Sequence, residues 1–177
     1  MKYLPILFAF LCMACVSSQK SIDFDPETYA ATITAEELKA HLYTYAGDDF
    51  MGREAGTEGE SVAINYLKGE YESIGIDGGM PDGAYFMPMT LNSYREKRSL
   101  EASNVLAFIE GSEIPNEILV ITAHLDHIGV EEDGKINNGA DDDGSGTVAI
   151  LEIAEAFQQA VQDGNGPKRS VLFLHVT

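Results

Sequence analysis

The sequence predicts an α/β fold, with a mixed, largely parallel sheet flanked by helices. Two apolar runs rich in β-branched residues, at 118–123 and 171–176, have the length and composition of buried strands. Two longer runs with helical spacing of their apolar residues, at 57–74 and 147–161, lie before and between these strands. Strands that alternate with helices favour a layered α/β architecture.

The composition is that of a folded protein with a strong negative charge. The chain has 177 residues, of which 45% are hydrophobic, and this length suits one domain. It carries 29 acidic and 11 basic side chains, for a formal net charge of −18. Because phosphates and anionic lipids repel such a surface, we expect no nucleic-acid partner and no charge-driven binding to anionic membranes.

Residues 1–18 resemble an export signal. One positive charge precedes an apolar run at 4–13, which is short for a membrane span. Ala14 and Cys15 resemble the end of a bacterial lipobox, although Cys12 stands where a leucine is usual. We therefore expect export, as a periplasmic or outer-membrane lipoprotein attached through a lipidated Cys15, or as a secreted protein after ordinary cleavage near Ala14. Both cysteines lie in this segment, so the folded part has no disulfide and no thiolate zinc site.

Residues 19–33 are predicted to be a tether, and residues 34–177 the folded domain. Thr34 and Glu37 have the spacing of a capping box, in which a hydroxyl and a carboxylate serve backbone N–H groups at the start of a helix. His41 lies within that helix, and we expect it to be a surface or partly packed histidine, not a ligand.

A glycine-containing turn leads from this helix to the next one. Gly52 and Gly56 fit a close turn around Arg53. We expect the rigid guanidinium of Arg53 to clamp local carbonyls or carboxylates, with a role in substrate binding as the alternative. The helix at 57–74 follows, and Gly75 has the position of a left-handed residue just past its end.

Two further strands are predicted before the central one. They lie at 85–91 and 104–109, joined by a charged link at 93–102. Pro88 cannot donate to a strand ladder, so the first of them is predicted to be an edge strand. A turn at 111–117 then leads into the central strand.

The central strand runs into side chains of the kinds that bind metals. These are His124, Asp126 and His127 at its end, then Asp141, Asp142 and Asp143 in the loop that precedes the helix at 147–161. In an open α/β sheet, ligands gather where strands end and loops begin. Imidazole and carboxylate groups at such an edge suit a divalent metal, and zinc fits best. The alternatives are a chance His-x-Asp pair and a solvated acidic turn or N-cap, but the combination favours a metal-dependent hydrolase.

Beyond the acidic loop, the pattern predicts a helix and a second buried strand. The helix at 147–161 has an apolar stripe, with Glu152 and Glu155 on the other side. His175 lies in the strand at 171–176, and we expect it to be a packed core histidine, not a catalytic one.

The stretch around the metal-binding side chains resembles the M28 family of zinc peptidases. The resemblance rests on HLDHIG at 124–129, NGADDDGSGTVA at 138–149 and LEIA at 151–154, and extends more loosely from about residue 34 to residue 177. Members of this family are mostly aminopeptidases with two co-catalytic zinc ions. The resemblance therefore implies a zinc aminopeptidase-like fold, two zinc ions as cofactors and peptides as substrates.

The resemblance also implies roles for individual residues. His124 would be a ligand of one zinc ion, and Asp126 would orient that histidine from behind. Asp142 would bridge the two ions, with Asp141 and Asp143 as neighbours and not ligands. In the family the peptide bond after the bridging aspartate is typically cis, so we expect a cis bond between Asp142 and Asp143.

The general base of the family falls outside the matching stretch. A strand like residues 169–177 runs in the family into Gly-Glu-Glu, whose first glutamate is the general base and whose second is a zinc ligand. The chain reaches Thr177 where this motif would begin. We therefore expect residues 34–177 to correspond to the N-terminal part of a catalytic domain. Such a part would have an incomplete sheet with an exposed edge, no general base and no activity alone.

The predicted function is that of a zinc-dependent exopeptidase, an aminopeptidase that hydrolyses N-terminal peptide bonds with a water activated by two zinc ions. One alternative is a non-catalytic relative or binding module, against which His124, Asp126 and Asp142 argue. The other is carboxypeptidase or glutaminyl cyclase chemistry on the same scaffold, but the cyclases generally depart from this acidic loop. Substrate side-chain preference, amino- versus carboxy-terminal specificity and oligomeric state stay open.

Overall fold

The computed structural model describes residues 25–93 and 98–177. The predicted export signal at 1–18, with the lipid-attachment residue Cys15, lies outside these ranges. Within them, no helix combines the length and the apolar character needed to cross a membrane.

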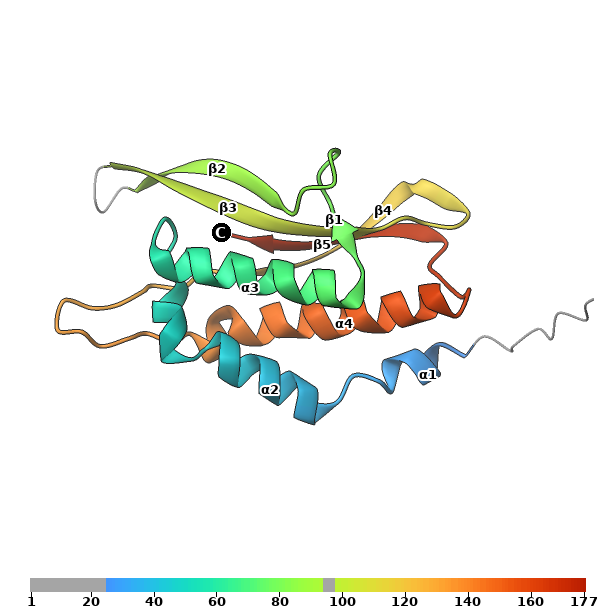
Figure 1. Cartoon of the computed structure of the whole chain (residues 1–177), viewed down its shortest axis with the longest axis horizontal. Coiled ribbons are helices and arrows are strands. Elements are labelled where there is room, and N and C mark those ends of the chain that lie inside the picture. Colours follow the sequence, from blue (N-terminus) through green and yellow to red (C-terminus); the bar gives the residue numbers. More distant parts are fainter. Residues whose placement is uncertain (1–24, 94–97) are drawn as a thin grey trace, which may run out of the picture.

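The described chain folds as a sheet with its helices on one face (Figure 1). In the described residues the sheet has five strands, in the order β1-β3-β5-β4 with β2 paired to β3. The strands are β1 (Asp77–Gly78), β2 (Phe86–Ser93), β3 (Arg98–Ile109), β4 (Ile114–His124) and β5 (Arg169–Val176). The helices are α1 (Pro26–Ala30), α2 (Ala35–Tyr45), α3 (Glu58–Ile74) and α4 (Ser145–Gln162), with a 3₁₀ segment η1 (Asp48–Arg53) and a π-type turn η2 (Ala140–Gly144).

The sheet is mixed, but less parallel than the sequence predicts. β4 runs parallel to β5, whereas β3 pairs antiparallel with β1, β2 and β5. The reason is connectivity, because parallel neighbours need a crossover. Between its described strands the chain makes one such crossover, in which α4 leads from β4 to β5. The α/β class and the flanking helices are confirmed, and the expectation of largely parallel pairing does not hold for the described strands.

The β2–β3 hairpin is longer than the sequence predicts. β3 begins at Arg98, so the predicted charged link at 93–102 is mostly strand. Exposed polar pairs support it, since the Thr90 hydroxyl donates to the carboxylate of Glu101 on the opposite strand. In the described chain β2 pairs with β3 alone, which confirms the edge position predicted from Pro88.

β4 is an exposed edge strand, although its apolar sequence predicts a buried one. It begins at Ile114, inside the predicted turn at 111–117. The side chains of Ile118, Leu119 and Val120 are 54%, 50% and 48% exposed. Among the described residues β4 has β5 on one side and no strand on the other. Apolar composition reports which side chains favour burial, not whether a neighbour exists to bury them. β4 is therefore an exposed edge of the described sheet.

A short helix lies within the predicted tether. Asp25 caps α1 by accepting a hydrogen bond from the N–H of Glu27, and Pro26 occupies the first turn, where a missing N–H costs nothing. Tyr29 then donates to Asp163 just after α4. Residues 26–30 are therefore part of the fold, and the tether prediction is wrong for them.

Two helix boundaries follow the predicted capping signals. The N–H of Glu37 donates to the Thr34 hydroxyl at 3.2 Å, and that hydroxyl donates to the Glu37 carboxylate at 2.7 Å. The capping box thus forms with a side-chain contact in place of the second backbone bond. α3 ends at Gly75, which is left-handed with φ of 78°.

One side chain of α4 is buried against expectation. Glu152 falls on the polar side by helical spacing, yet it is 4% exposed. α2 covers this side of α4, and Nε2 of His41 lies 3.5 Å from Oε1 of Glu152. Burial raises the pKa of the Glu152 carboxyl. His41 also contacts the Tyr66 hydroxyl, at 2.6 Å, and is partly packed as predicted.

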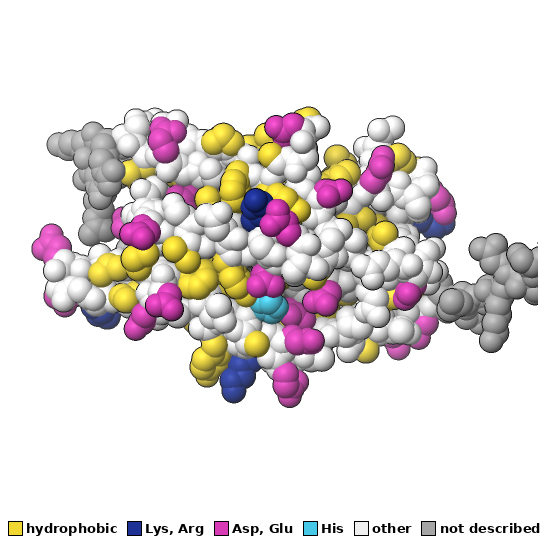
Figure 2. Space-filling model, viewed as in Figure 1, with side chains coloured by type: hydrophobic (Ala, Val, Ile, Leu, Met, Phe, Trp, Pro, Cys, Tyr) yellow, Lys and Arg dark blue, Asp and Glu magenta, His cyan; other side chains and the backbone are white. Residues whose placement is uncertain are grey.

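The hydrophobic core fills the space between the sheet and its helices. Its buried members come from α2, α3, β3, α4 and β5, and include Tyr45, Leu67, Tyr71, Val105, Val148, Leu151 and Phe173. Outside this core, acidic side chains are spread over the side of the molecule seen in Figure 2, and basic ones are few there. That distribution accords with the net charge of −18.

His175 is a core histidine, as the sequence predicts. It is fully buried in β5, and its Nε2 lies 2.7 Å from the Tyr71 hydroxyl. Its Nδ1 has no hydrogen-bond partner among the described residues. Burial disfavours the imidazolium and lowers the pKa of His175 to about 3. The ring is therefore neutral at physiological pH.

Acid should destabilise the fold through His175. Its folded pKa of about 3 lies below the ordinary value of 6.5, so the unfolded chain takes up the proton first. The stabilisation is present above pH 6.5 and is lost as the pH falls towards 3, at roughly 1.4 kcal/mol per pH unit. Chemical unfolding at pH 7 and pH 5 measures this loss.

A double variant, Tyr71→Phe with His175→Leu, removes both polar groups and should flatten that acid dependence. His41→Leu, at a partly exposed histidine, serves as the control and should keep it. An unchanged acid dependence in the double variant would show that other groups cause the loss.

Candidate metal centre

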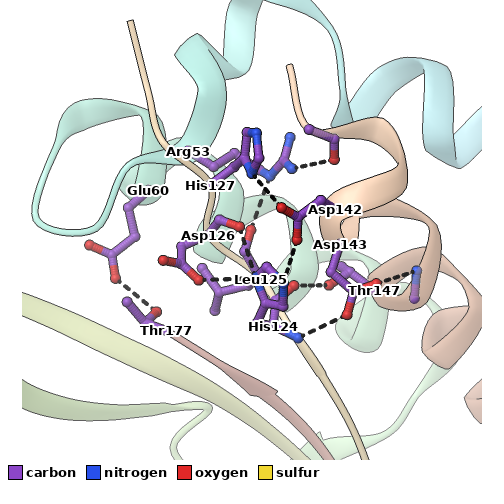
Figure 3. A network of polar contacts seen from close by, with 12 residues as sticks. Arg53, Glu60, His124, Leu125, Asp126, His127, Asp142, Asp143, Thr147 and Thr177 are labelled. Atoms are coloured by element: carbon purple, nitrogen blue, oxygen red, sulfur yellow. Dashed lines mark hydrogen bonds and ion pairs between the residues drawn. The ribbon is translucent and has the colours of Figure 1, made fainter. Parts of the chain in front are cut away.

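The centre forms where the end of β4 meets the loop before α4 (Figure 3). His124 is the last residue of β4, and Asp142 lies in η2. Nε2 of His124 is 3.0 Å from Oδ1 of Asp142. The structure thus brings together the two residues for which the sequence suggests metal binding, because the crossover through α4 returns the acidic loop to the carboxyl end of β4.

Asp126 lies behind the His124 ring. Its Oδ1 is 3.3 Å and its backbone oxygen 3.1 Å from Nδ1 of His124, so Nε2 is the nitrogen that faces Asp142. Partial burial disfavours a charged ring, but the carboxylates of Asp126 and Asp142 outweigh it and raise the pKa of His124. The His124 and Asp142 side chains are 40% and 71% exposed, so both are open to a ligand from solvent.

Asp143 is turned away from the His124 ring and holds the backbone. Its Oδ1 accepts the N–H of Gly146 at 3.1 Å, and its Oδ2 accepts the N–H of His124 at 3.3 Å. The peptide bond between Asp142 and Asp143 is cis, as the resemblance implies. The carbonyl of Asp141 accepts the Ser145 hydroxyl, and its side chain is exposed. Consecutive carboxylates therefore have different surroundings.

Arg53 ties three segments of the site together from inside the protein. Its side chain is fully buried, with Nε on the carbonyl of Leu125 at 3.0 Å. Nη1 donates to the carbonyls of Tyr45 and Asn138, and Nη2 to that of Gly139. The predicted clamp on local carbonyls is confirmed. The Arg53 side chain thereby joins η1 to Leu125, the residue after His124, and to the start of the acidic loop before α4.

Two residues that the sequence did not single out for the site support this clamp. The Tyr45 hydroxyl donates to the Leu125 carbonyl at 2.9 Å, and its ring lies 4.6 Å from the Arg53 guanidinium carbon. Asn138 donates through Nδ2 to the carbonyl of Ala46. Helical spacing predicts that Tyr45 packs on the apolar face of α2. It does not predict the hydrogen bond that the Tyr45 hydroxyl makes.

His127 is a further residue of the site, which the sequence places among the potential metal-binding side chains and to which the family resemblance assigns no role. Its Nδ1 lies 3.6 Å from Oδ2 of Asp142, and its side chain is 14% exposed. The available signal was a second histidine directly after His-x-Asp. Spacing alone does not tell on which side of the strand end its ring lies.

The end of β5 is fixed beside the centre by buried polar groups. Glu60 of α3 is 3% exposed, and its carboxylate accepts the N–H groups of Gly56 and Ser103 and the Thr177 hydroxyl. Asn104, 6% exposed, accepts the N–H of Thr177 at 2.9 Å. Thr177 therefore has a defined position (Figure 3).

Glu60→Gln should destabilise the protein by roughly 1–3 kcal/mol, because an amide N–H would face backbone N–H donors that now share a carboxylate. Thermal or urea unfolding measures the effect. Glu58→Gln, on an exposed residue of the same helix, is the matched control and should change little. Equal stability of the two variants would contradict a role for the buried carboxylate.

The donor atoms of His124 and Asp142 are of the types that bind zinc. Imidazole nitrogen and carboxylate oxygen are zinc ligands, and bonds of about 2.0–2.1 Å in tetrahedral geometry separate neighbouring donors by roughly 3.3 Å. The 3.0 Å between His124 Nε2 and Asp142 Oδ1 is close to that spacing. Catalytic zinc usually takes three protein ligands. The described residues contain no group of three or more such side chains placed to hold an ion.

Comparison with known proteins identifies the family. The sequence model of Peptidase family M28 matches residues 104–177, a segment that includes His124, Asp126 and Asp142. Leucine aminopeptidase 1 of Grosmannia clavigera is 30% identical over 144 residues, which are 79% of this chain and 33% of that protein. The chain belongs to peptidase family M28. It spans about a third of the length of the curated relatives it matches.

Solved structures share the fold of this M28 chain. A leucine aminopeptidase precursor from Bacteroides thetaiotaomicron has a TM-score of 0.60 at 21% identity, and the match covers 80% of this chain and 46% of that one. A glutaminyl cyclase from Porphyromonas gingivalis has a TM-score of 0.62 at 18% identity, covering 82% of this chain and 48% of that one. At such identities these likenesses establish the architecture alone.

Proposed function

We propose that the protein to which this M28 chain belongs is a zinc-dependent aminopeptidase that hydrolyses N-terminal peptide bonds. The observation that carries the proposal is the pairing of His124 Nε2 with Asp142 Oδ1 at 3.0 Å, on an exposed loop at the end of a strand. Membership of a peptidase family and the likeness to a leucine aminopeptidase support it.

In this proposal Asp142 would be shared by two zinc ions, and His124 would hold one of them. When bound, zinc supplies a Lewis acid that polarises the substrate carbonyl and lowers the pKa of water. The contact of Asp126 with Nδ1 directs Nε2 of His124 towards the metal. Arg53 and Asp143 keep the loop in place through backbone contacts. We assign the general base to none of the described residues, so residues 1–177 alone should be inactive.

Export is a second part of the proposal. We propose that residues 1–18 direct the protein out of the cytoplasm and that Cys15 is the site of lipid attachment. Labelling with a palmitate analogue should mark the wild-type protein and not Cys15→Ser, and Cys12→Ser should be marked as wild type. Release of unlabelled protein into the medium would instead support ordinary cleavage.

The test of the activity is hydrolysis of leucine p-nitroanilide by the protein expressed from its complete reading frame. Activity should vanish with a chelator and return with added zinc. His124→Ala should abolish it, and an N-acetylated substrate should resist cleavage, because an aminopeptidase needs a free α-amine. Cyclisation of a peptide with N-terminal glutamine, without release of leucine, would replace the peptidase by a glutaminyl cyclase.

A further inference from the structure

The Asp142 carboxylate lies between two imidazole rings, of which the proposed function uses one. His124 faces Oδ1 through Nε2 at 3.0 Å, and His127 faces Oδ2 through Nδ1 at 3.6 Å. Figure 3 shows the His124 and His127 rings on either side of this carboxylate, with a contact drawn from each. Each oxygen of the carboxylate therefore has its own histidine.

The His127 ring is held in this position by backbone on two sides. The backbone N–H of His127 donates to the carbonyl of Arg53 at 3.2 Å, in a strand-like bridge between Glu54 and His127 that fixes the backbone from which the ring projects. Gly139 lies against the ring, since a Cβ on that glycine would come 2.5 Å from Cγ of His127. Gly139 has φ of 58° and its carbonyl accepts from Arg53. The loop that carries Asp142 therefore packs directly against the His127 ring.

An exposed carboxylate on a loop needs such a contact to hold one orientation. The Asp142 side chain is 71% exposed, against 14% for His127, so the protein packs around the histidine far more than around the aspartate. Nδ1 of His127, at 3.6 Å, faces Oδ2, the oxygen that His124 does not contact, and a proton on this nitrogen would point towards that oxygen. Groups that orient a ligand in this way typically contribute 10–100-fold to metal affinity.

We propose that His127 is a positioning residue, whose Nδ1–H donates to Asp142 Oδ2 and sets the orientation of the bridging carboxylate. The proposal rests on Asp142 being a metal ligand, as in the proposed function. The ring acts through the aspartate and does not bind the ion itself.

Two substitutions separate this role from packing and from ligation. His127→Asn places an amide N–H close to the position of the imidazole Nδ1–H, and His127→Leu removes the donor and retains bulk. Zinc affinity is measured by competition with a chromogenic chelator on the complete protein, and Co²⁺ is titrated while its visible absorption is recorded. His127→Leu should bind zinc 10–100-fold more weakly and change the cobalt spectrum, whereas His127→Asn should keep both near wild type.

Two other results would contradict the positioning role of His127. Wild-type affinity in His127→Leu would overturn the proposal, and so would His127→Asn binding as weakly as His127→Leu, since loss with either substitution marks a direct ligand. His41→Leu and His41→Asn, at a histidine outside the site, control for the general effect of losing an imidazole. Thermal unfolding of every variant separates a destabilised fold from a disordered ligand.

The same measurements separate this proposal from the proposed function. If zinc binding depends on His127 but leucine p-nitroanilide is not cleaved, the aminopeptidase assignment fails and the positioning role stands. If the wild-type protein shows no saturable binding of zinc or cobalt, the positioning role is overturned.

Discussion

Arg53→Ala is expected to lower the free energy of unfolding by about 3–5 kcal/mol, a large effect for one side chain. The substitution removes the guanidinium donor from the carbonyls of Leu125, Tyr45, Asn138 and Gly139. Leu125 keeps the Tyr45 hydroxyl and Gly139 keeps the N–H of Gly144, so the carbonyls of Tyr45 and Asn138 lose most, and each unpaired carbonyl costs on the order of 1–3 kcal/mol unless water reaches it. Urea unfolding measures the loss. Arg53→Lys should recover little of it, because one ammonium cannot reach three separate segments.

The matched control for Arg53 is Arg169→Ala. Arg169 pairs with Glu117 at 2.6 Å across β4 and β5, but its side chain is 58% exposed. An exposed ion pair contributes about 0–1 kcal/mol, so this variant should unfold near wild type. Similar losses for the two arginines would contradict the view that the buried clamp holds the site together.

Asp142→Asn is expected to reduce zinc affinity by more than about 100-fold, beyond the usual effect of losing a group that only orients a ligand. The amide has the shape of the carboxylate but lacks its charge and presents one oxygen in place of two. The complete protein should also lose its peptidase activity. Because Asp142 is 71% exposed, stability should change little, which separates loss of the metal from loss of the fold.

Asp141→Asn is the control, since the same chemistry is altered one residue away. The Asp141 side chain is exposed, and only its backbone carbonyl has a described contact, with Ser145. Zinc binding should match wild type. If Asp141→Asn weakened zinc as much as Asp142→Asn, the assignment of ligand and neighbour would be reversed.

Short-range sequence patterns predicted the helix boundaries and the meeting of His124 with Asp142. The capping box at Thr34 and the left-handed Gly75 depend on neighbours in sequence, and both formed. The rule that loops meet at the carboxyl ends of strands correctly brought His124 to Asp142. The cis bond after Asp142 came from the family resemblance and not from the physics of the residues.

Features that depend on distant partners were not readable from the sequence. β4 is apolar yet exposed, because its composition does not report whether a neighbouring strand covers it. Glu152 is charged yet buried, because α2 covers the side that helical spacing assigns to solvent. The contact between His127 and Asp142 depends on the side of the strand end to which the ring turns.

The contacts of the Arg53 clamp join residues far apart along the chain, and this sets the order in which the centre can assemble. Arg53 is 86 positions from Gly139, and Tyr45 is 80 positions from Leu125. Closing loops of this length costs entropy before any contact repays it, so such contacts form late in folding. Residues 104–177 contain His124 and Asp142 but neither Arg53 nor Tyr45. That segment alone would carry the candidate ligands without the clamp that orders their loop, so metal would meet an ordered centre only after the amino-terminal segment of the domain has docked.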